Sequence, residues 1–150
     1  MGRKYKFLEH TADVKFLASG KTPEKLFMNS ALALKESMCG KIKVGEKIKK
    51  SINIRGKDFE ALLYRFLEEI LFMLDAENFI IARVSRIKIG NKFDLKATVI
   101  GDKASEYEFT NPVKAVTYND MFVKKEIELV DTSQGKKEKE NWTAQVVLDV

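Results

Sequence analysis

The sequence predicts an α+β fold: a mostly antiparallel β-sheet, or sheets, of about seven or eight strands with two helices packed on it. Two observations predict this class. Runs with strand-like alternation far outnumber segments with helical periodicity, which excludes a doubly wound parallel fold. The 150 residues also contain no internal repeat or low-complexity linker, so we expect a single domain covering residues 1–150.

Capping signals and apolar spacing predict the two helices. Thr22 and Pro23 form a helix start and Gly40 a helix end, so the first helix should cover residues 23–39. The second helix follows a turn at residues 56–58. Its apolar residues keep i, i+3, i+4 spacing without a break: Phe59, Leu62, Leu63, Phe66, Leu67, Ile70, Leu71 and Leu74. Burying these side chains, at about 1.5–3 kcal/mol each before conformational entropy, makes this helix the main contributor to the core.

Period-two alternation between turn signals predicts the strands. They should cover residues 5–8, 14–18, 47–55, 79–89, 93–101, 113–118 and 122–130, with a last strand closing the chain. Gly90 and Asn91 predict a hairpin turn, residues 102–111 a polar surface excursion, and residues 136–140 a mixed-charge hairpin tip. Along the last strand, alternation places Asp149 on the face opposite its large apolar neighbours.

The positive charge is concentrated in one segment, residues 41–57. The chain has 27 Lys and Arg against 22 Asp and Glu, a net charge of +5. This basic stripe contains Glu46 as its one acid before Asp58 and these basic residues: Lys41, Lys43, Lys47, Lys49, Lys50, Arg55 and Lys57. It could attract phosphate backbones, or form a solvated strand face whose lysines discourage edge association. No aromatic residue is interleaved for base stacking. An RNA-binding or chaperone-like module acting through residues 41–57 stays open as an alternative function.

Composition indicates a cytoplasmic protein without a membrane partner. Hydrophobic residues make up 45% of the chain and aromatic residues 10%, as in globular proteins. No apolar run approaches the ~20 residues of a membrane span, and the basic residues 1–6 lead into no apolar signal-peptide core. The one cysteine, Cys39, excludes an internal disulfide and a cysteine zinc site, which suits a reducing compartment.

A short polar segment near the N-terminus is the first candidate site. Glu9, the one histidine His10, Thr11 and Asp13 lie between two strand-like runs. A turn at a sheet end can present such side chains to a ligand. In the alternative interpretation, Thr11 or Asp13 only caps the turn by bonding a backbone N–H. The other end of the chain offers a further carboxylate, Asp149, after an apolar run.

Four short segments match the motifs of one family in order along nearly the whole chain. As they stand here, they are residues 6–14 (KFLEHTADV), 58–64 (DFEALLY), 113–118 (VKAVTY) and 147–150 (VLDV). Each is weak alone, but four in order, with the aspartate next to the chain end, make the chain resemble the archease family. Asn119 is a departure, because many members have a histidine after the Thr-Tyr pair, and it affects any role assigned to that position.

The resemblance implies a non-enzymatic activator of the tRNA-splicing RNA ligase, which joins a 3′-phosphate end to a 5′-hydroxyl end in tRNA splicing and RNA repair. Such a protein promotes attachment of GMP to the ligase's active-site histidine and so supports repeated turnover. The family's metal site corresponds to Asp13, Asp149 and the terminal Val150, so the two chain ends should meet. Calcium is the expected cation, with Mg²⁺ or another divalent ion as the alternative. Lys114 and His10 are the expected ligase-activation residues.

The chemistry of these residues agrees with that expectation. Carboxylates and neighbouring hydroxyl or carbonyl oxygens form an oxygen-only set that suits Ca²⁺ or Mg²⁺ rather than zinc. Three negative groups would repel one another without a cation, so bound metal should also stabilise the fold.

Two other functions remain as alternatives to the activator. The first is the RNA-binding or chaperone-like module, which would bind RNA weakly through residues 41–57. The second is a small metal-dependent hydrolase using His10, Asp13 and Asp149. The sequence argues against the hydrolase, because it has no glycine-rich phosphate loop and no second histidine for acid–base work. The oligomeric state stays open.

Overall fold

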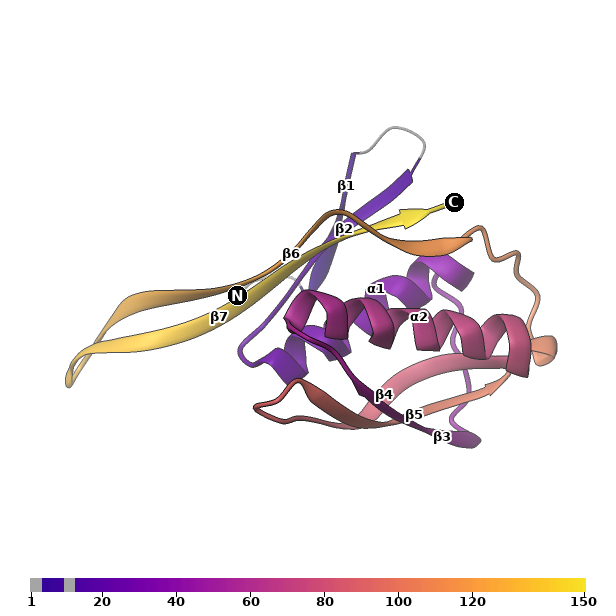
Figure 1. The fold of residues 1–150 in the computed structure, drawn as a ribbon, viewed down its shortest axis with the longest axis horizontal. Helices are drawn as coiled ribbons and strands as arrows, with labels where there is room; N and C mark the ends of the chain where they lie inside the picture. The colour runs from indigo at the N-terminus through magenta and orange to yellow at the C-terminus, as the bar shows by residue number, and fades with distance from the viewer. Residues whose placement is uncertain (1–3, 10–12) are drawn as a thin grey trace.

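The computed structural model describes residues 4–9 and 13–150 and arranges them in three layers (Figure 1). A four-stranded sheet and a three-stranded sheet enclose the two helices between them. The elements in chain order are β1 (Tyr5–Leu8), β2 (Asp13–Gly20), α1 (Pro23–Cys39), β3 (Ile48–Arg55), α2 (Phe59–Glu77), β4 (Phe79–Ile89), β5 (Asp94–Lys103), the 3-10 turn η1 (Ala104–Glu106), β6 (Ala115–Thr132) and β7 (Gly135–Asp149). The predicted α+β class is confirmed, with seven strands.

The chain divides between the two sheets by position. The first two and last two strands form the four-stranded sheet in the order β1-β2-β7-β6, and the middle strands form the three-stranded sheet in the order β3-β5-β4. All neighbouring strands are antiparallel. Because α1 packs on β2 and β4, and α2 on β6, β3 and β4, the helices contact both sheets. Each sheet therefore keeps an outer face that neither helix covers (Figure 1).

Both helices begin with a side-chain cap, and the Thr22 cap is the one that the sequence predicts. The Thr22 hydroxyl accepts a backbone N–H from the first turn of α1 at 3.1 Å. Asp58 Oδ1 accepts the Ala61 N–H at 2.7 Å and so caps α2. At its other end α2 stops at Asn78, whose left-handed φ of 53° breaks the helical hydrogen-bond pattern. In the described part of the chain, no helix is long and apolar enough to cross a membrane.

The core lies between the sheets and is centred on the helices. Phe27 of α1 and Phe66 of α2 are fully buried, and their ring centroids lie 5.7 Å apart. Most of the apolar face predicted for α2 is buried with them, while Phe59 and Leu74 at the two ends of that face are half-buried. The periodicity of α2 therefore identified the inner layer of the fold.

The strand β6 differs from the prediction of two separate strands. The strand that begins within residues 113–118 continues through residues 122–130 and stays in the sheet. The pairing of β6 with β7 is interrupted between Thr117 and Phe122, where extra residues of β6 bulge out. Polar residues in this bulge gave the appearance of a loop in the sequence, but the backbone of β6 stays beside β7 on both sides of it.

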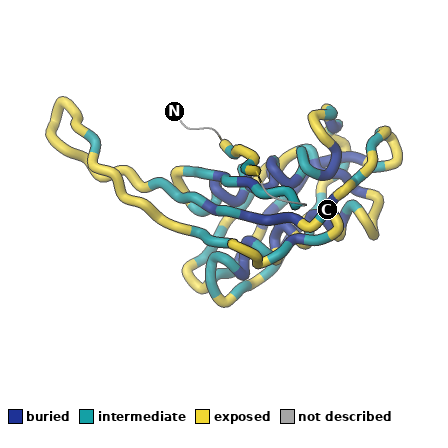
Figure 2. The backbone as a smooth tube through the Cα atoms, turned by 90° about the horizontal axis from the view of Figure 1, so that it is seen from above, coloured by how far each residue is buried: buried dark blue, intermediate teal, exposed yellow. Residues whose placement is uncertain are grey.

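The predicted hairpin tip at residues 136–140 is also wrong. These residues lie within β7, and the chain turns earlier, at residues 133–134. The outer parts of β6 and β7, residues 126–141, form a hairpin arm that extends beyond the two other layers (Figure 1). Its residues are mostly exposed on both faces (Figure 2). Backbone pairing rather than burial holds the arm together, so its side chains carry no core pattern that the sequence could reveal.

Residues 102–111 were expected at the surface, but Asp102 belongs to β5 and is 5% exposed. Its carboxylate accepts the Tyr107 hydroxyl at 2.7 Å, and the Tyr107 oxygen accepts the Gly45 N–H at 2.7 Å. The Tyr107 hydroxyl and then the Lys103 N–H hold the pKa of Asp102 below its usual value. This hydrogen-bond chain satisfies a buried carboxylate and ties the segment before β3 to the end of β5.

Candidate metal centre

Two aspartates from opposite ends of the chain lie side by side on neighbouring strands of the four-stranded sheet. Asp13 begins β2, Asp149 ends β7, and the two are direct partners in the antiparallel register. Directly opposite residues project from the same face of a sheet, with their Cβ atoms about 4.5–5.5 Å apart. The structure therefore brings together two candidate ligands whose proximity no sequence spacing predicted.

Both aspartates belong to the outer face of this sheet. The next pair in the register, Val14 and Leu148, alternates to the other side, and Leu148 is fully buried against the core. Asp149 is exposed and Asp13 is half-buried. A ligand that approaches from solvent can therefore reach carboxylates from both strands.

The electrostatics of this pair suit a hard cation. Like charges at directly opposite positions destabilise a sheet, and a divalent cation would remove that repulsion. Val150, the third residue that the family resemblance implies for the metal site, follows Asp149 directly. Within residues 4–9 and 13–150, no three His, Cys, Asp or Glu side chains are grouped as a metal-binding set. Asp13 and Asp149 by themselves therefore supply only part of the oxygen ligands that a Ca²⁺ ion takes.

Lys114 is held beside this pair through its backbone. Its N–H donates to the carbonyl oxygen of Asp149 at 2.8 Å, and the following residue, Ala115, is the register partner of Asp149 on β6. The Lys114 residue is exposed. Since the anchoring bond is made by the main chain, changing the side chain leaves it in place. His10, the other expected activation residue, lies outside the described residues, as does Thr11.

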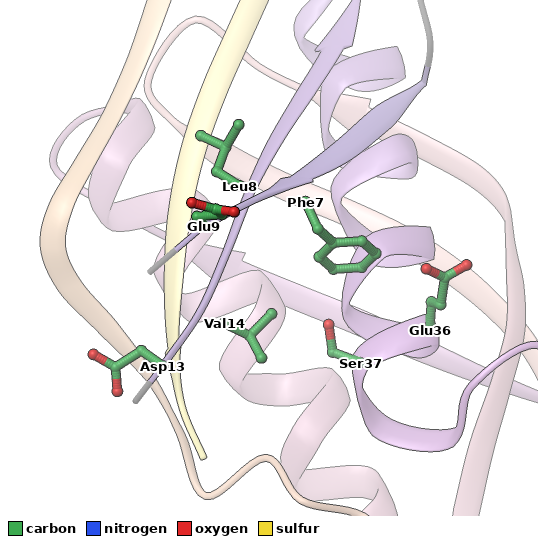
Figure 3. Close-up of a pocket in the computed structure, with 7 residues that line it drawn as sticks. All are labelled: Phe7, Leu8, Glu9, Asp13, Val14, Glu36 and Ser37. Atoms are coloured by element: carbon green, nitrogen blue, oxygen red, sulfur yellow. The ribbon is translucent and has the colours of Figure 1, made fainter. Parts of the chain in front are cut away.

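A hollow of about 850 Å³ opens beside Asp13, between the ends of β1 and β2 and the last turns of α1 (Figure 3). In Figure 3 the Phe7 ring faces Glu36 and Ser37, while Glu9 and Asp13 lie toward the opposite side. The lining residues are Phe7, Leu8, Glu9, Asp13, Val14, Glu36 and Ser37. This lining contains three carboxylates and no basic side chain, so the hollow favours a cation over an anion.

Sequence reasoning did not find the contribution of α1 to this hollow. Glu36 and Ser37 reach it because α1 packs against the first two strands. The Tyr5 hydroxyl donates to Glu36 Oε1 at 3.2 Å and so connects β1 to the helix. Burial and then the negative charge of Glu36 raise the pKa of Tyr5. No local signal in residues 23–39 could have indicated this, because it depends on which strand the helix packs against.

The profile of the archease protein family (MTH1598/TM1083) matches residues 5–150, which include both aspartates and Lys114. The chain belongs to the archease family. Two proteins named archease are similar over nearly their full lengths. That of Methanosarcina mazei is 34% identical over 154 residues, covering 99% of this chain and 97% of its own. That of Pyrococcus furiosus is 33% identical over 153 residues, covering 99% of each.

Two solved structures have the same archease fold. Protein 1598 of Methanobacterium thermoautotrophicum superposes with a TM-score of 0.72 and 30% identity, covering 98% of this chain and 99% of its own. A Thermotoga maritima protein described as an archease and possible chaperone has a TM-score of 0.60 and 18% identity, covering 97% and 96%. At that identity, the second structure supports the fold alone.

The departure from the archease pattern at Asn119 lies in the bulge of β6. The Thr117 hydroxyl donates to the Val147 carbonyl at 2.9 Å and accepts the Asn119 N–H at 3.3 Å. Tyr118, which is 56% exposed, stacks on Tyr64 of α2 with ring centroids 4.1 Å apart. Because the Asn119 side chain takes part in none of these contacts, the departure changes an exposed group and leaves the bulge itself intact.

Proposed function

We propose that this archease-family protein is a non-enzymatic activator of the RNA ligase that joins 3′-phosphate and 5′-hydroxyl ends in tRNA splicing and RNA repair. It would promote guanylylation of the ligase's active-site histidine and thereby support repeated turnover. The observation that carries the proposal is the pairing of Asp13 with Asp149 at a sheet end, with the backbone of Lys114 bonded to Asp149.

The proposal includes a Ca²⁺ site formed by Asp13, Asp149 and the Val150 carboxylate, with Mg²⁺ as the alternative cation. Ca²⁺ takes about 6–8 oxygen ligands, and these three carboxylates supply about three to six, depending on whether each binds through one or both of its oxygens. Water or oxygens of a partner would fill the remaining positions, so the site is suited to share its cation with a partner. Once bound, the cation would neutralise negative charge at the nucleotide phosphates, which is a large part of the cost of phosphoryl transfer.

The proposed role of Lys114 follows from its anchoring. Its main chain is bonded to the main chain of Asp149, so the Lys114 backbone is fixed next to one member of the acidic pair. A lysine acts on phosphates as a mobile point charge. Lys114 would therefore help to orient the triphosphate of GTP in the ligase, and His10 would contribute from the segment that precedes Asp13. The cytoplasm is part of the proposal, because the single cysteine suits reducing conditions.

The test measures guanylylation and multiple-turnover RNA ligation by the cognate ligase with the wild-type protein and with Asp13→Ala and Lys114→Ala variants. Lys137→Ala, which removes an exposed lysine from the hairpin arm, is the matched control. We expect stimulation by the wild type and by Lys137→Ala, and strongly reduced stimulation by the other two. A lack of stimulation at every protein-to-ligase ratio would reject the activator. Phosphoester hydrolysis by the isolated protein, lost in Asp13→Ala, would favour the hydrolase instead.

A further inference from the structure

The outer face of the three-stranded sheet is uncovered and basic. Strand β5 lies in the centre of this sheet with β3 and β4 on either side, and the helices pack on the opposite face (Figure 1). Residues that alternate with the buried core positions project from the outer face into solvent. The basic residues among them are Lys49, Arg55, Arg83, Arg86, Lys88 and Lys96, and all are exposed. We call this surface the basic sheet face.

The strand register arranges these basic residues in rows across the sheet. From β3 through β5 to β4, the rows are Lys49–Ile100–Arg83, Ser51–Thr98–Arg86 and Asn53–Lys96–Lys88, followed by the pair Arg55–Asp94. Neighbouring strands lie about 4.8 Å apart. The cations are therefore spread across the width of the sheet and not along a single edge.

The basic sheet face keeps most of its charge uncompensated. Arg83 alone has an ion-pair partner, Glu46, with contacts of 3.0–3.2 Å; for the other five cations, no carboxylate in the described chain lies within ion-pairing distance. Lys88 and Lys96 are direct register partners, although like charges at opposite positions destabilise a sheet. A bound anion would convert this repulsion into attraction, so the pair indicates a functional surface rather than a solvated one.

The structure also divides the basic stripe of residues 41–57. Lys49 joins the basic sheet face, whereas Lys50 alternates to the inner side of β3. There its ammonium group lies 3.2 Å from Glu77 of α2 and 5.6 Å from the centroid of the Phe79 ring. A polyanion on the basic sheet face can therefore contact only some of the basic residues of β3. It can also contact the cations of β4 and β5.

We propose that the basic sheet face binds the phosphate backbone of duplex RNA. The face presents cations from three strands and no aromatic side chain, which favours sequence-independent phosphate contacts over the base stacking used for single strands. The choice of RNA among phosphate polymers rests on the proposed function, whereas the phosphate chemistry rests on this face alone. The candidate metal centre lies on the other sheet, beyond the helix layer, so bound RNA would leave Asp13 and Asp149 accessible to the ligase.

The test measures binding of a fluorescent RNA duplex of roughly 20 base pairs as a function of salt concentration. The variant is Lys88→Gln/Lys96→Gln, and the matched control is Lys136→Gln/Lys137→Gln, which removes the same charge from the hairpin arm. Each lost phosphate contact reduces the magnitude of the negative slope of log K against log salt by about 0.9, so the slope of the variant should be smaller in magnitude by about 1.8. The control should retain the wild-type slope. An equal loss in the control, or no duplex binding at about 50 mM salt, would overturn the proposal.

Further measurements distinguish RNA from other anionic ligands and distinguish RNA binding from the proposed activation of the ligase. Tighter binding of a DNA duplex of the same length, or binding of phosphatidylserine vesicles without binding of RNA, would overturn the assignment to RNA. Guanylylation of the ligase involves no RNA, so Lys88→Gln/Lys96→Gln should stimulate it like the wild type. Loss of RNA binding with intact stimulation supports the assignment to this face. If the protein binds RNA but stimulates no ligase, the assignment of RNA to the basic sheet face is kept and the activator is rejected.

Discussion

Asp13 and Asp149 stand directly opposite each other on β2 and β7, although they come from the two ends of the chain. The like-charge pair opposes sheet formation, and yet it ends the longest-range strand pairing in the four-stranded sheet. The apolar pair next to it, half-buried Val14 with fully buried Leu148, holds the two residues together. A cation bound here would lie between two chain ends that this pairing brings together.

Removing one carboxylate should abolish stabilisation by Ca²⁺. At a Ca²⁺ concentration about a hundred times Kd, binding stabilises the wild type by about 2.7 kcal/mol, or a Tm increase of about 5–10 °C. We expect no such increase for Asp13→Asn. In EDTA, which removes the cation, this variant and the wild type should differ in stability by less than about 1 kcal/mol. Thermal unfolding with and without Ca²⁺ measures both effects.

Asp131→Asn, in the exposed hairpin arm, is the control for that experiment and should respond to Ca²⁺ like the wild type. If an Asp13→Asn/Asp149→Asn double variant still gained the full Tm increase, the metal site would have to lie elsewhere.

Tyr107→Phe should destabilise the protein at neutral pH. The change removes the donor to the Asp102 carboxylate and the acceptor of the Gly45 N–H, and leaves both groups without these partners. Unsatisfied buried polar groups are costly, and we expect a Tm decrease of about 3–8 °C by calorimetry. Tyr118→Phe, which removes an exposed hydroxyl, is the matched control and should change the Tm by less than about 1–2 °C.

The same hydrogen-bond chain should make stability depend on pH. The pKa of Asp102 is lowered in the folded state, so its contribution is complete above the usual value of 3.8 and is lost as the pH falls through the lowered value. The Tm difference between wild type and Tyr107→Phe should therefore be larger at about pH 7 than at about pH 2–3. A difference that stayed constant over this range would mean that the ionised carboxylate is not the group that Tyr107 stabilises.

Two phenylalanines of α2 should differ sharply in their contribution to stability. Phe66 is fully buried against Phe27, and Phe66→Ala should cost about 3–5 kcal/mol through lost burial and the cavity left behind. Phe72 lies on the same helix but is 52% exposed, and Phe72→Ala should cost less than about 1 kcal/mol. Urea unfolding compares the two variants. Similar costs would contradict the assignment of the inner layer.

Shortening the hairpin arm should leave the body of the protein folded. Glu126 and Asn141 are register partners, and the residues beyond them lie outside the core, with Ile127 56% and Leu129 64% exposed. We expect a variant with a two-residue turn in place of residues 127–140 to keep its Tm within about 4 °C of the wild type. Loss of cooperative unfolding would show that the arm is needed for the four-stranded sheet. Ligase stimulation by the same variant would show whether the arm contacts the partner.

The sequence by itself determined the elements whose signals are local. The Thr22 cap, the turn at residues 56–58, the apolar spacing of α2 and the alternation of the strands depend on neighbours a few residues away. For that reason the helix starts and the α+β class were predictable. The residues of the family resemblance were also sufficient to name Asp13, Asp149 and Lys114 as candidates.

Tertiary structure alone decided which distant elements meet. The register that opposes Asp13 to Asp149, and the placement of Lys49 on the same face as the hairpin pair Lys88 and Lys96, require strands distant in sequence to pair. The approach of α1 to the hollow likewise depends on how the helix packs on the first two strands. Long-range pairing follows from how apolar faces fit together, and periodicity shows that a face exists without showing its partner. The hairpin arm was misjudged for the opposite reason: it has no buried face, so backbone pairing and a few exposed side-chain contacts define it.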